Sequence, residues 1–171
     1  MIDCALTRRS GSARAAAAGA SEVWRMDRLA EIEEIKKLKA RYFRLMDEKR
    51  WDEWAQVFSE DFVGIYHGPH PELRFDGRAA IVSENRRILA TAKTIHHGHM
   101  PEIELTSETS ATGIWAMFDY VELPEFTLQG YGHYHEEYVK RGGRWEIKSI
   151  RLTRLRCDVV PGAPSGGSGA A

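Results

Sequence analysis

The chain has little cysteine, no long apolar segment and no excess of positive charge. Cys4 and Cys157 are the only cysteines among 171 residues, and they lie in opposite terminal regions. This usage provides neither a disulfide framework nor a paired spacing for zinc, and it fits a reducing compartment. No stretch is apolar enough to span a bilayer. We therefore predict a cytoplasmic protein without a membrane partner.

The charge balance excludes a second class of partner. The sequence has 24 Lys and Arg residues against 25 Asp and Glu residues, for a formal net charge of −1. No surplus of basic residues is available to neutralise a nucleic-acid backbone, so nucleic acid is not an expected partner. With 43% hydrophobic residues, a chain of this length is suited to one globular domain with a real core.

The two ends differ in composition from the middle. Residues 1–26 hold an alanine run but lack the Leu- or Val-rich centre of a secretory signal. They are predicted to be a disordered leader, or to precede a second start at Met26. Residues 159–171 are rich in Gly, Ser, Pro and Ala and are predicted to be a flexible tail. The folded domain is expected over residues 27–158.

Hydrophobic periodicity predicts helices first and strands afterwards. Residues 27–47 place apolar side chains at helical spacing, and shorter helices are expected within 51–62 and 77–90. Alternating or β-branched segments predict strands at 62–68, 73–75, 95–106, 110–123, 128–141 and 144–157. The glycine pair in "RGGR" indicates a hairpin turn between the last two strands. The expected class is α+β, with helices packed on one face of a curved, mostly antiparallel sheet.

Several motifs resemble one family. The segments "EIKKLKARYFRLMDEKRWDEWAQVFSEDF", "HHGHMPEIEL", "TSATGIWAMFD" and "YVKRGGRWEIKSIRLTR" are similar to the SnoaL-like branch of the nuclear transport factor 2 superfamily over about residues 28–156. The likeness is greatest to the bile acid 7-alpha-dehydratases, and more distant to scytalone dehydratase and hexachlorocyclohexane dehydrochlorinase. It implies a cone-shaped fold around an apolar pocket, in which polar side chains perform acid/base chemistry without a cofactor.

The same resemblance implies a catalytic set. Its members are Tyr42, Asp47, His96, Asp119 and Arg154. Related dehydratases form trimers, so the resemblance also implies a homo-oligomer, either a trimer or a dimer.

The histidine tract of residues 96–99 is the most unusual local feature. On a regular strand His96 faces one way, whereas His97 and His99 face the other, so only one side can line a pocket. His96 is either a structural residue or a catalytic base. His99 stays open, because the path from Gly98 to Pro101 could turn it inward. A metal site needs three or four convergent ligands, and the spacing is unlike that of known zinc sites, so no metal is predicted.

The other candidates each have a structural and a functional interpretation. Asp119 interrupts an apolar run, and is either a strand-end carboxylate or the acceptor that orients the His96 imidazole through Nδ1. We favour the second interpretation. Tyr42 is either a core aromatic or a phenol that binds a substrate oxygen. Asp47 is by default a solvated or capping residue at the end of its helix, and a catalytic role for it rests on the resemblance. Arg154 is expected to pair with Asp47 or with the substrate.

These residues together predict a function. The leading hypothesis is a cofactor-free dehydratase that removes water from a hydroxylated alicyclic ketone of steroid or polyketide type. A double-bond isomerase would use the same base, and a protein that only binds a small hydrophobic ligand is the competing class. The residues expected to contact the substrate are His99, Trp115, Met117, Tyr131 and His133.

Overall fold

The computed structural model describes residues 9–68 and 71–162, and side chains from Asp27 onward. The helices are α1 (Arg9–Asp47), α2 (Trp51–Ala55) and α3 (Arg78–Leu89). The strands are β1 (Phe58–Tyr66), β2 (Leu73–Asp76), β3 (Lys93–Leu105), β4 (Ser110–Leu123), β5 (Phe126–Arg141) and β6 (Arg144–Pro161). This order confirms the predicted α+β class.

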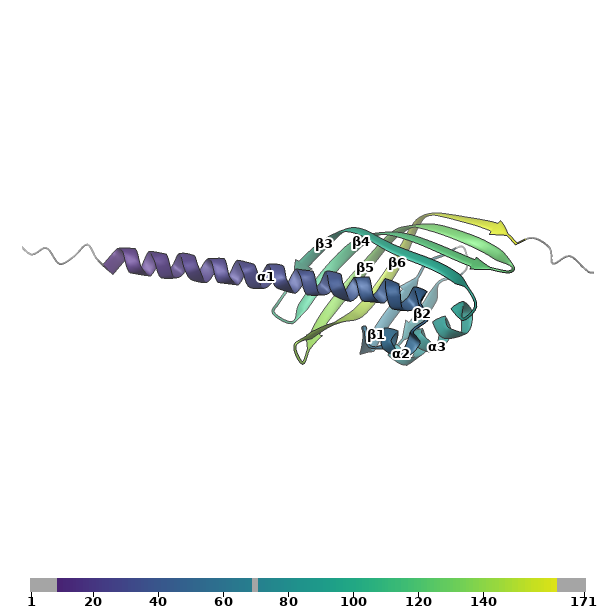
Figure 1. The fold of residues 1–171 in the computed structure, drawn as a ribbon, viewed down its shortest axis with the longest axis horizontal. Coiled ribbons are helices and arrows are strands. Elements are labelled where there is room, and N and C mark those ends of the chain that lie inside the picture. Colours follow the sequence, from purple (N-terminus) through teal and green to yellow (C-terminus); the bar gives the residue numbers. More distant parts are fainter. Residues whose placement is uncertain (1–8, 69–70, 163–171) are drawn as a thin grey trace, which may run out of the picture.

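One curved sheet forms the body of the molecule. Its six strands lie in the order β2-β1-β6-β5-β4-β3. β1 runs parallel to β6, and the remaining neighbours are antiparallel. Figure 1 shows the sheet curving around the C-terminal half of α1, with α2 and α3 at one end of the body. Because β3 to β6 are long and bent, their concave face can enclose side chains from α1.

Two backbone features shape the sheet. Gly142 and Gly143 have φ values of 57° and 79°, which confirms the predicted tight turn between β5 and β6. On β3 the register with β4 shifts between His99 and Glu102, and Met100 there has a φ of 41°. A bulge of this kind increases the local bend of a strand. It also leaves His96, which precedes it, in regular pairing with β4.

The apolar stripe of α1 forms the centre of the core. Ile35, Leu38, Tyr42, Leu45 and Met46 recur at three- and four-residue spacing and are all buried. The Tyr42 ring packs on the rings of Trp54, Phe58 and Tyr134, with centroids 5.6 Å, 5.8 Å and 6.3 Å away. These contacts fix the last turns of α1 against the sheet.

Three boundaries differ from the sequence prediction. α1 begins at Arg9, so residues 9–26 are helical and not a disordered leader. Alanine has the highest helix propensity. The amphipathic segment that follows packs on the sheet and nucleates the helix, which the alanine-rich segment then only has to extend. Residues 1–8 lie outside the described part of the chain. α2 ends at Ala55, because Phe58 already pairs with β6. β6 extends to Pro161, and residues 163–171 of the predicted tail lie outside the described residues.

The structure adds one observation on membranes. Within the described residues, no helix is both long enough and apolar enough to cross a bilayer.

Candidate active site

A cavity of about 230 Å³ lies between α1, α3 and the concave face of the sheet. Its apolar lining includes Leu73, Phe75, Ile88, Val121, Leu123, Phe126 and Leu128. Its polar lining includes Tyr42, Tyr66, His67, His96, Asp119, Tyr134 and Arg154. The cavity thus combines an apolar wall with several titratable groups, as small-molecule sites commonly do.

His96, which lines this cavity, forms a hydrogen-bonded dyad with Asp47. The His96 Nδ1 atom lies 2.6 Å from Asp47 Oδ1, and the backbone N–H of His96 donates to Asp47 Oδ2 over 2.9 Å. A carboxylate can only accept, so Nδ1 carries the hydrogen and Nε2 of the neutral ring keeps its lone pair. The His96 side chain is 7% exposed. The dyad therefore has the arrangement of a general base with its orienting carboxylate.

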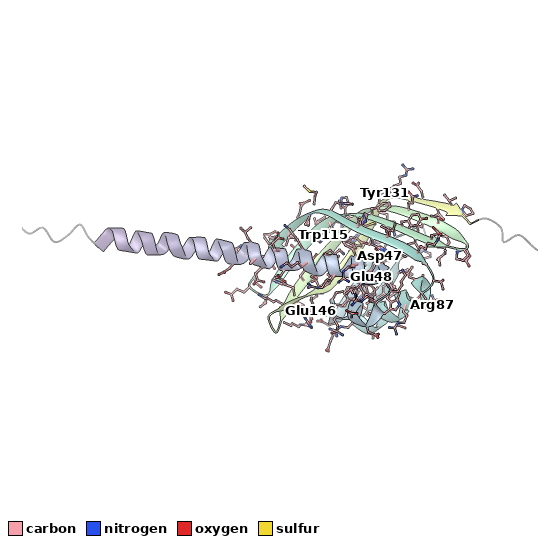
Figure 2. All side chains as sticks on the ribbon, viewed as in Figure 1. Asp47, Glu48, Arg87, Trp115, Tyr131 and Glu146 are labelled. Atoms are coloured by element: carbon pink, nitrogen blue, oxygen red, sulfur yellow. The ribbon has the colours of Figure 1, made fainter. Side chains whose placement is uncertain are left out.

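The position of Asp47 follows from the end of α1. Asp47 is the last residue of that helix, where the helix dipole disfavours a negative charge. Burial raises the pKa of its carboxyl, but the hydrogen bonds from His96 and Thr94 together with the charge of His96 more than offset this, so the pKa lies below its usual value. Asp47 is consequently a carboxylate at neutral pH. Figure 2 shows it at the end of α1, in the middle of the body.

Asp119 does not orient His96, so that part of the sequence prediction is wrong. The two residues lie opposite each other on β3 and β4, but Asp119 binds Arg154. Nη1 and Nη2 of Arg154 donate to Oδ1 and Oδ2 of Asp119 over 2.9 Å and 2.7 Å. Arg154 likewise pairs with Asp119 and not with Asp47, its predicted partner within the chain. A fork-to-fork geometry explains the choice, because both carboxylate oxygens are used at once.

Gly130 makes room for this ion pair. A Cβ atom at Gly130 would lie 1.7 Å from Arg154 Nη1 and 2.1 Å from Asp119 Oδ1. The Arg154 Nε atom is buried without a hydrogen-bond partner, as is Nε2 of His67, and both residues line the cavity. Buried polar atoms are rarely left unsatisfied. These two atoms thus mark places where polar atoms of a ligand could bind.

Three phenols complete the polar lining. Burial is the main cause that raises the pKa of Tyr42, Tyr66 and Tyr134, so all three stay protonated at neutral pH and can donate hydrogen bonds. The structure thus places the predicted Tyr42 in the cavity. Tyr66 and His67 also line the cavity, and the sequence analysis did not predict them. Their polar side chains at the end of the strand in "FVGIYHG", directly before a turn, could have indicated a site.

None of the five predicted substrate-contact residues lines the cavity. Trp115 and Met117 point inward but are buried in the core, where Trp115 Nε1 donates to the Tyr138 hydroxyl over 2.8 Å. His99, Tyr131 and His133 lie on the opposite, outer face of the sheet. Figure 2 shows Tyr131 at the margin of the body. Strand alternation is the reason, since Tyr134 on β5 faces inward and its odd-numbered neighbours cannot.

A buried ion pair beneath the cavity was also missed. Lys39 and Glu136 have fully buried side chains and form a salt bridge, and Tyr138 donates to the same Glu136 carboxylate. The Lys39 ammonium lies 4.0 Å from the Tyr42 ring centroid and 3.8 Å from that of Tyr134. Burial lowers the pKa of Lys39, and Glu136 opposes that change. This pair holds two cavity-lining rings from behind.

The described residues hold no group of three or more His, Cys, Asp or Glu side chains placed to bind a metal ion.

Comparisons with known proteins agree with this architecture. The family model described as a SnoaL-like domain matches residues 27–151. A probable cyclase of Gibberella zeae is 26% identical over 133 residues, covering 71% of this chain and 89% of the relative. A candidate scytalone dehydratase of Novosphingobium aromaticivorans is 25% identical with a TM-score of 0.67, covering 81% of this chain and 95% of that one.

A more distant structure shows the same fold. The type 3 hexachlorocyclohexane dehydrochlorinase of Novosphingobium barchaimii is 18% identical with a TM-score of 0.67, and the match covers 81% of this chain and 94% of that one.

Fold and site together define an α+β protein whose curved sheet and helices enclose a pocket with acid/base side chains. The chain belongs to the SnoaL-like domain family, within the superfamily of nuclear transport factor 2-like folds.

Proposed function

We propose that this protein is a cofactor-free lyase that removes water from a hydroxylated alicyclic ketone. The observation that carries the proposal is the His96–Asp47 dyad, whose buried imidazole lines an apolar cavity beside hydrogen-bond donors. The unprotonated Nε2 of His96 belongs to a ring whose other nitrogen, Nδ1, is held by a carboxylate. Such a base is suited to removing a proton made acidic by a neighbouring carbonyl.

The reaction would proceed by proton transfer through His96. The C–H proton passes to Nε2, and Asp47 stabilises the imidazolium that forms. The C–H electron pair becomes the new carbon–carbon double bond as the carbon–oxygen bond breaks. The leaving oxygen takes a proton from the imidazolium, which releases water and restores the base. Tyr42, Tyr66 or the unpartnered Nε of Arg154 would donate to the carbonyl oxygen as negative charge develops there.

The cavity favours a compact substrate within the steroid or polyketide class. Its volume of about 230 Å³ lies below the range of about 300–1,000 Å³ common for sites of drug-sized ligands. We therefore favour a polyketide-like ketone of one or two rings over a full steroid skeleton. The relatives named as a cyclase and a scytalone dehydratase support this class, since one name denotes ring formation and the other removal of water.

A double-bond isomerase is the second candidate, and one observation favours it. The dyad offers a single strong base, while the neighbouring phenols have raised pKa values and are weak acids. One base that takes a proton and returns it to another carbon needs no second acid. The two reactions differ in their products, because only dehydration releases water.

A substrate screen tests the proposal. Hydroxylated ketones of one, two and four rings would be incubated with the protein in deuterated buffer and analysed by mass spectrometry. Dehydration predicts products that lack the elements of water, and isomerisation predicts products of unchanged elemental composition, with deuterium at carbon only where the abstracted proton exchanges with solvent before it is returned. The His96→Ala variant should be inactive, while His97→Ala, on the outer face of the same strand, serves as the matched control. Binding of these ketones without turnover by the wild type would favour the ligand-binding alternative.

A further inference from the structure

Lys49 occupies a backbone position that usually belongs to glycine. Its φ is 60°, and it lies two residues beyond Asp47, the last residue of α1. The N–H of Lys49 donates to the Met46 carbonyl over 3.1 Å, and that of Arg50 donates to the Leu45 carbonyl over 2.9 Å. This is the Schellman pattern, whose left-handed residue is most often glycine because other residues suffer a steric cost there. The contacts of the lysine side chain are therefore the place to look for the reason that this position is not a glycine.

The Lys49 side chain begins a chain of hydrogen bonds that ends at His96. Its Nζ donates to Thr94 Oγ1 over 2.6 Å, and the Thr94 hydroxyl donates to Asp47 Oδ1 over 2.8 Å. The same Oδ1 atom accepts from His96 Nδ1. An ammonium can only donate and a carboxylate can only accept, so the direction of every bond is determined. The chain leads from a half-buried cation to the candidate base.

We propose that Lys49 and Thr94 are positioning residues that orient the Asp47 carboxylate and adjust the basicity of the dyad. Thr94 fixes the rotation of the carboxylate, so that Oδ1 faces the imidazole while Oδ2 faces the His96 backbone. The Lys49 charge opposes the formation of a second cation at His96. His96 then releases its proton more readily after each turnover. The consequence for turnover rests on the proposed function, but the effect on the imidazole does not.

The other charged and titratable groups around the dyad do not replace Lys49. Arg154 and Asp119 form an ion pair with each other, so their charges cancel. Arg44 on α1 pairs with the Glu48 carboxylate. His97 and His99 extend from the outer face of β3. The remaining titratable groups that line the cavity are Tyr42, Tyr66, His67 and Tyr134. Within the described residues, Lys49 is thus the cation, besides His96 itself, that is linked to Asp47 by hydrogen bonds, through the Thr94 hydroxyl.

The decisive variant is Lys49→Gly, because it removes the ammonium while supplying the residue that the backbone favours. Its melting temperature should equal or exceed that of the wild type. The midpoint of its pH–rate profile should move upward by about half a pH unit, since loss of a nearby positive charge favours the imidazolium. Lys93→Ala is the matched control: Lys93 also lies on β3 next to Thr94, but it pairs with Glu122 over 2.7 Å. It should leave the profile unchanged.

A second pair of variants separates the hydroxyl from the charge. Thr94→Val keeps the shape of the side chain but breaks the path, whereas Thr94→Ser restores the hydroxyl. Thr94→Val should lower turnover several-fold and shift the pH profile in the same direction as Lys49→Gly, and Thr94→Ser should recover both properties.

A spectroscopic measurement keeps this test independent of any substrate. The ring nitrogen signals of His96, followed by ¹⁵N NMR across a pH series, report both its tautomer and its protonation. The inference predicts a higher titration midpoint in Lys49→Gly and in Thr94→Val than in the wild type, whether or not a substrate has been found. An unchanged titration in both variants would overturn it, and Lys49 would then serve only the helix end. A titration that shifts as expected in a protein without turnover would uphold the inference and count against the proposed function.

Discussion

The imidazole of His96 and the carboxylate of Asp47 meet at 2.6 Å although the two residues are 49 positions apart in the chain. The contact joins the last residue of α1 to the fourth residue of β3. Because Asp119 is bound by Arg154, the cavity is lined by members of two separate pairs, one suited to proton transfer and one suited to holding a polar group.

Breaking the Asp119–Arg154 pair should cost stability. The Asp119 and Arg154 side chains are 7% and 15% exposed. Replacing Asp119 with Asn leaves a buried guanidinium without its counter-ion, and removing one partner of a buried pair typically costs about 3 to 5 kcal/mol. Urea unfolding should show a loss near the lower end of this range, about 3 kcal/mol, because Asn can still accept one hydrogen bond. A loss below about 1 kcal/mol would show that solvent already screens the pair.

The glycine at position 130 should be required by the same pair. In Gly130→Ala the new methyl group would overlap the Arg154 and Asp119 side chains, so both must move. Turnover should fall and unfolding should occur at lower urea concentration. The free energy of unfolding should decrease by about 1 to 3 kcal/mol, which is typical of an overpacked site. Gly113→Ala provides a control on β4, since its nearest contact is the Tyr138 ring at 3.0 Å, away from the cavity. Equal effects of the two substitutions would argue against a specific role for Gly130.

The buried Lys39–Glu136 pair should show strong coupling in unfolding experiments. Lys39→Met leaves Glu136 buried with Tyr138 as its remaining partner, and should lower the free energy of unfolding by about 3 kcal/mol or more. The double substitution Lys39→Met with Glu136→Gln removes both charges and should recover much of that loss. Additive losses would contradict the interpretation of the two residues as one unit.

Acid should destabilise the protein partly through Asp47. Its folded-state pKa lies below the usual value, so its carboxylate favours the folded state above the ordinary carboxyl pKa of about 4. This contribution is lost as the pH falls below that value and through the lower folded-state pKa. Between pH 5 and pH 3, Asp47→Asn should therefore lose less stability than the wild type, as measured by thermal unfolding at each pH. Parallel losses in the two proteins would place the acid sensitivity in other carboxylates.

Local pattern was sufficient to predict most of the fold and part of the site. The helical stripe of α1 correctly oriented Tyr42 inward, and the alternation of β3 separated His96 from His97 and His99. Applied to β5, the same rule puts Tyr131 and His133 on the face opposite Tyr134, which lines the cavity, and so argues against the substrate contacts predicted for them.

The pairing of the charged groups could not be predicted. Asp47 and Asp119 are both within reach of one strand position, and the choice between them depends on how α1 meets β3, which no local pattern encodes. The sequence does carry a signal for the buried ion pair, because Lys39 shares the apolar stripe of α1 with Ile35 and Tyr42, and a lysine on such a stripe needs a buried partner.

Turnover of a confirmed substrate by His96→Ala, Asp47→Asn and the double variant tests the central claim most directly. If the two residues act as one base, each single substitution should reduce turnover by about 100-fold or more, the usual contribution of general acid–base catalysis. The double variant should then be little slower than His96→Ala, because residues that act as a unit lose their effects non-additively. Activity of His96→Ala equal to that of the wild type, or losses that multiply in the double variant, would contradict the account.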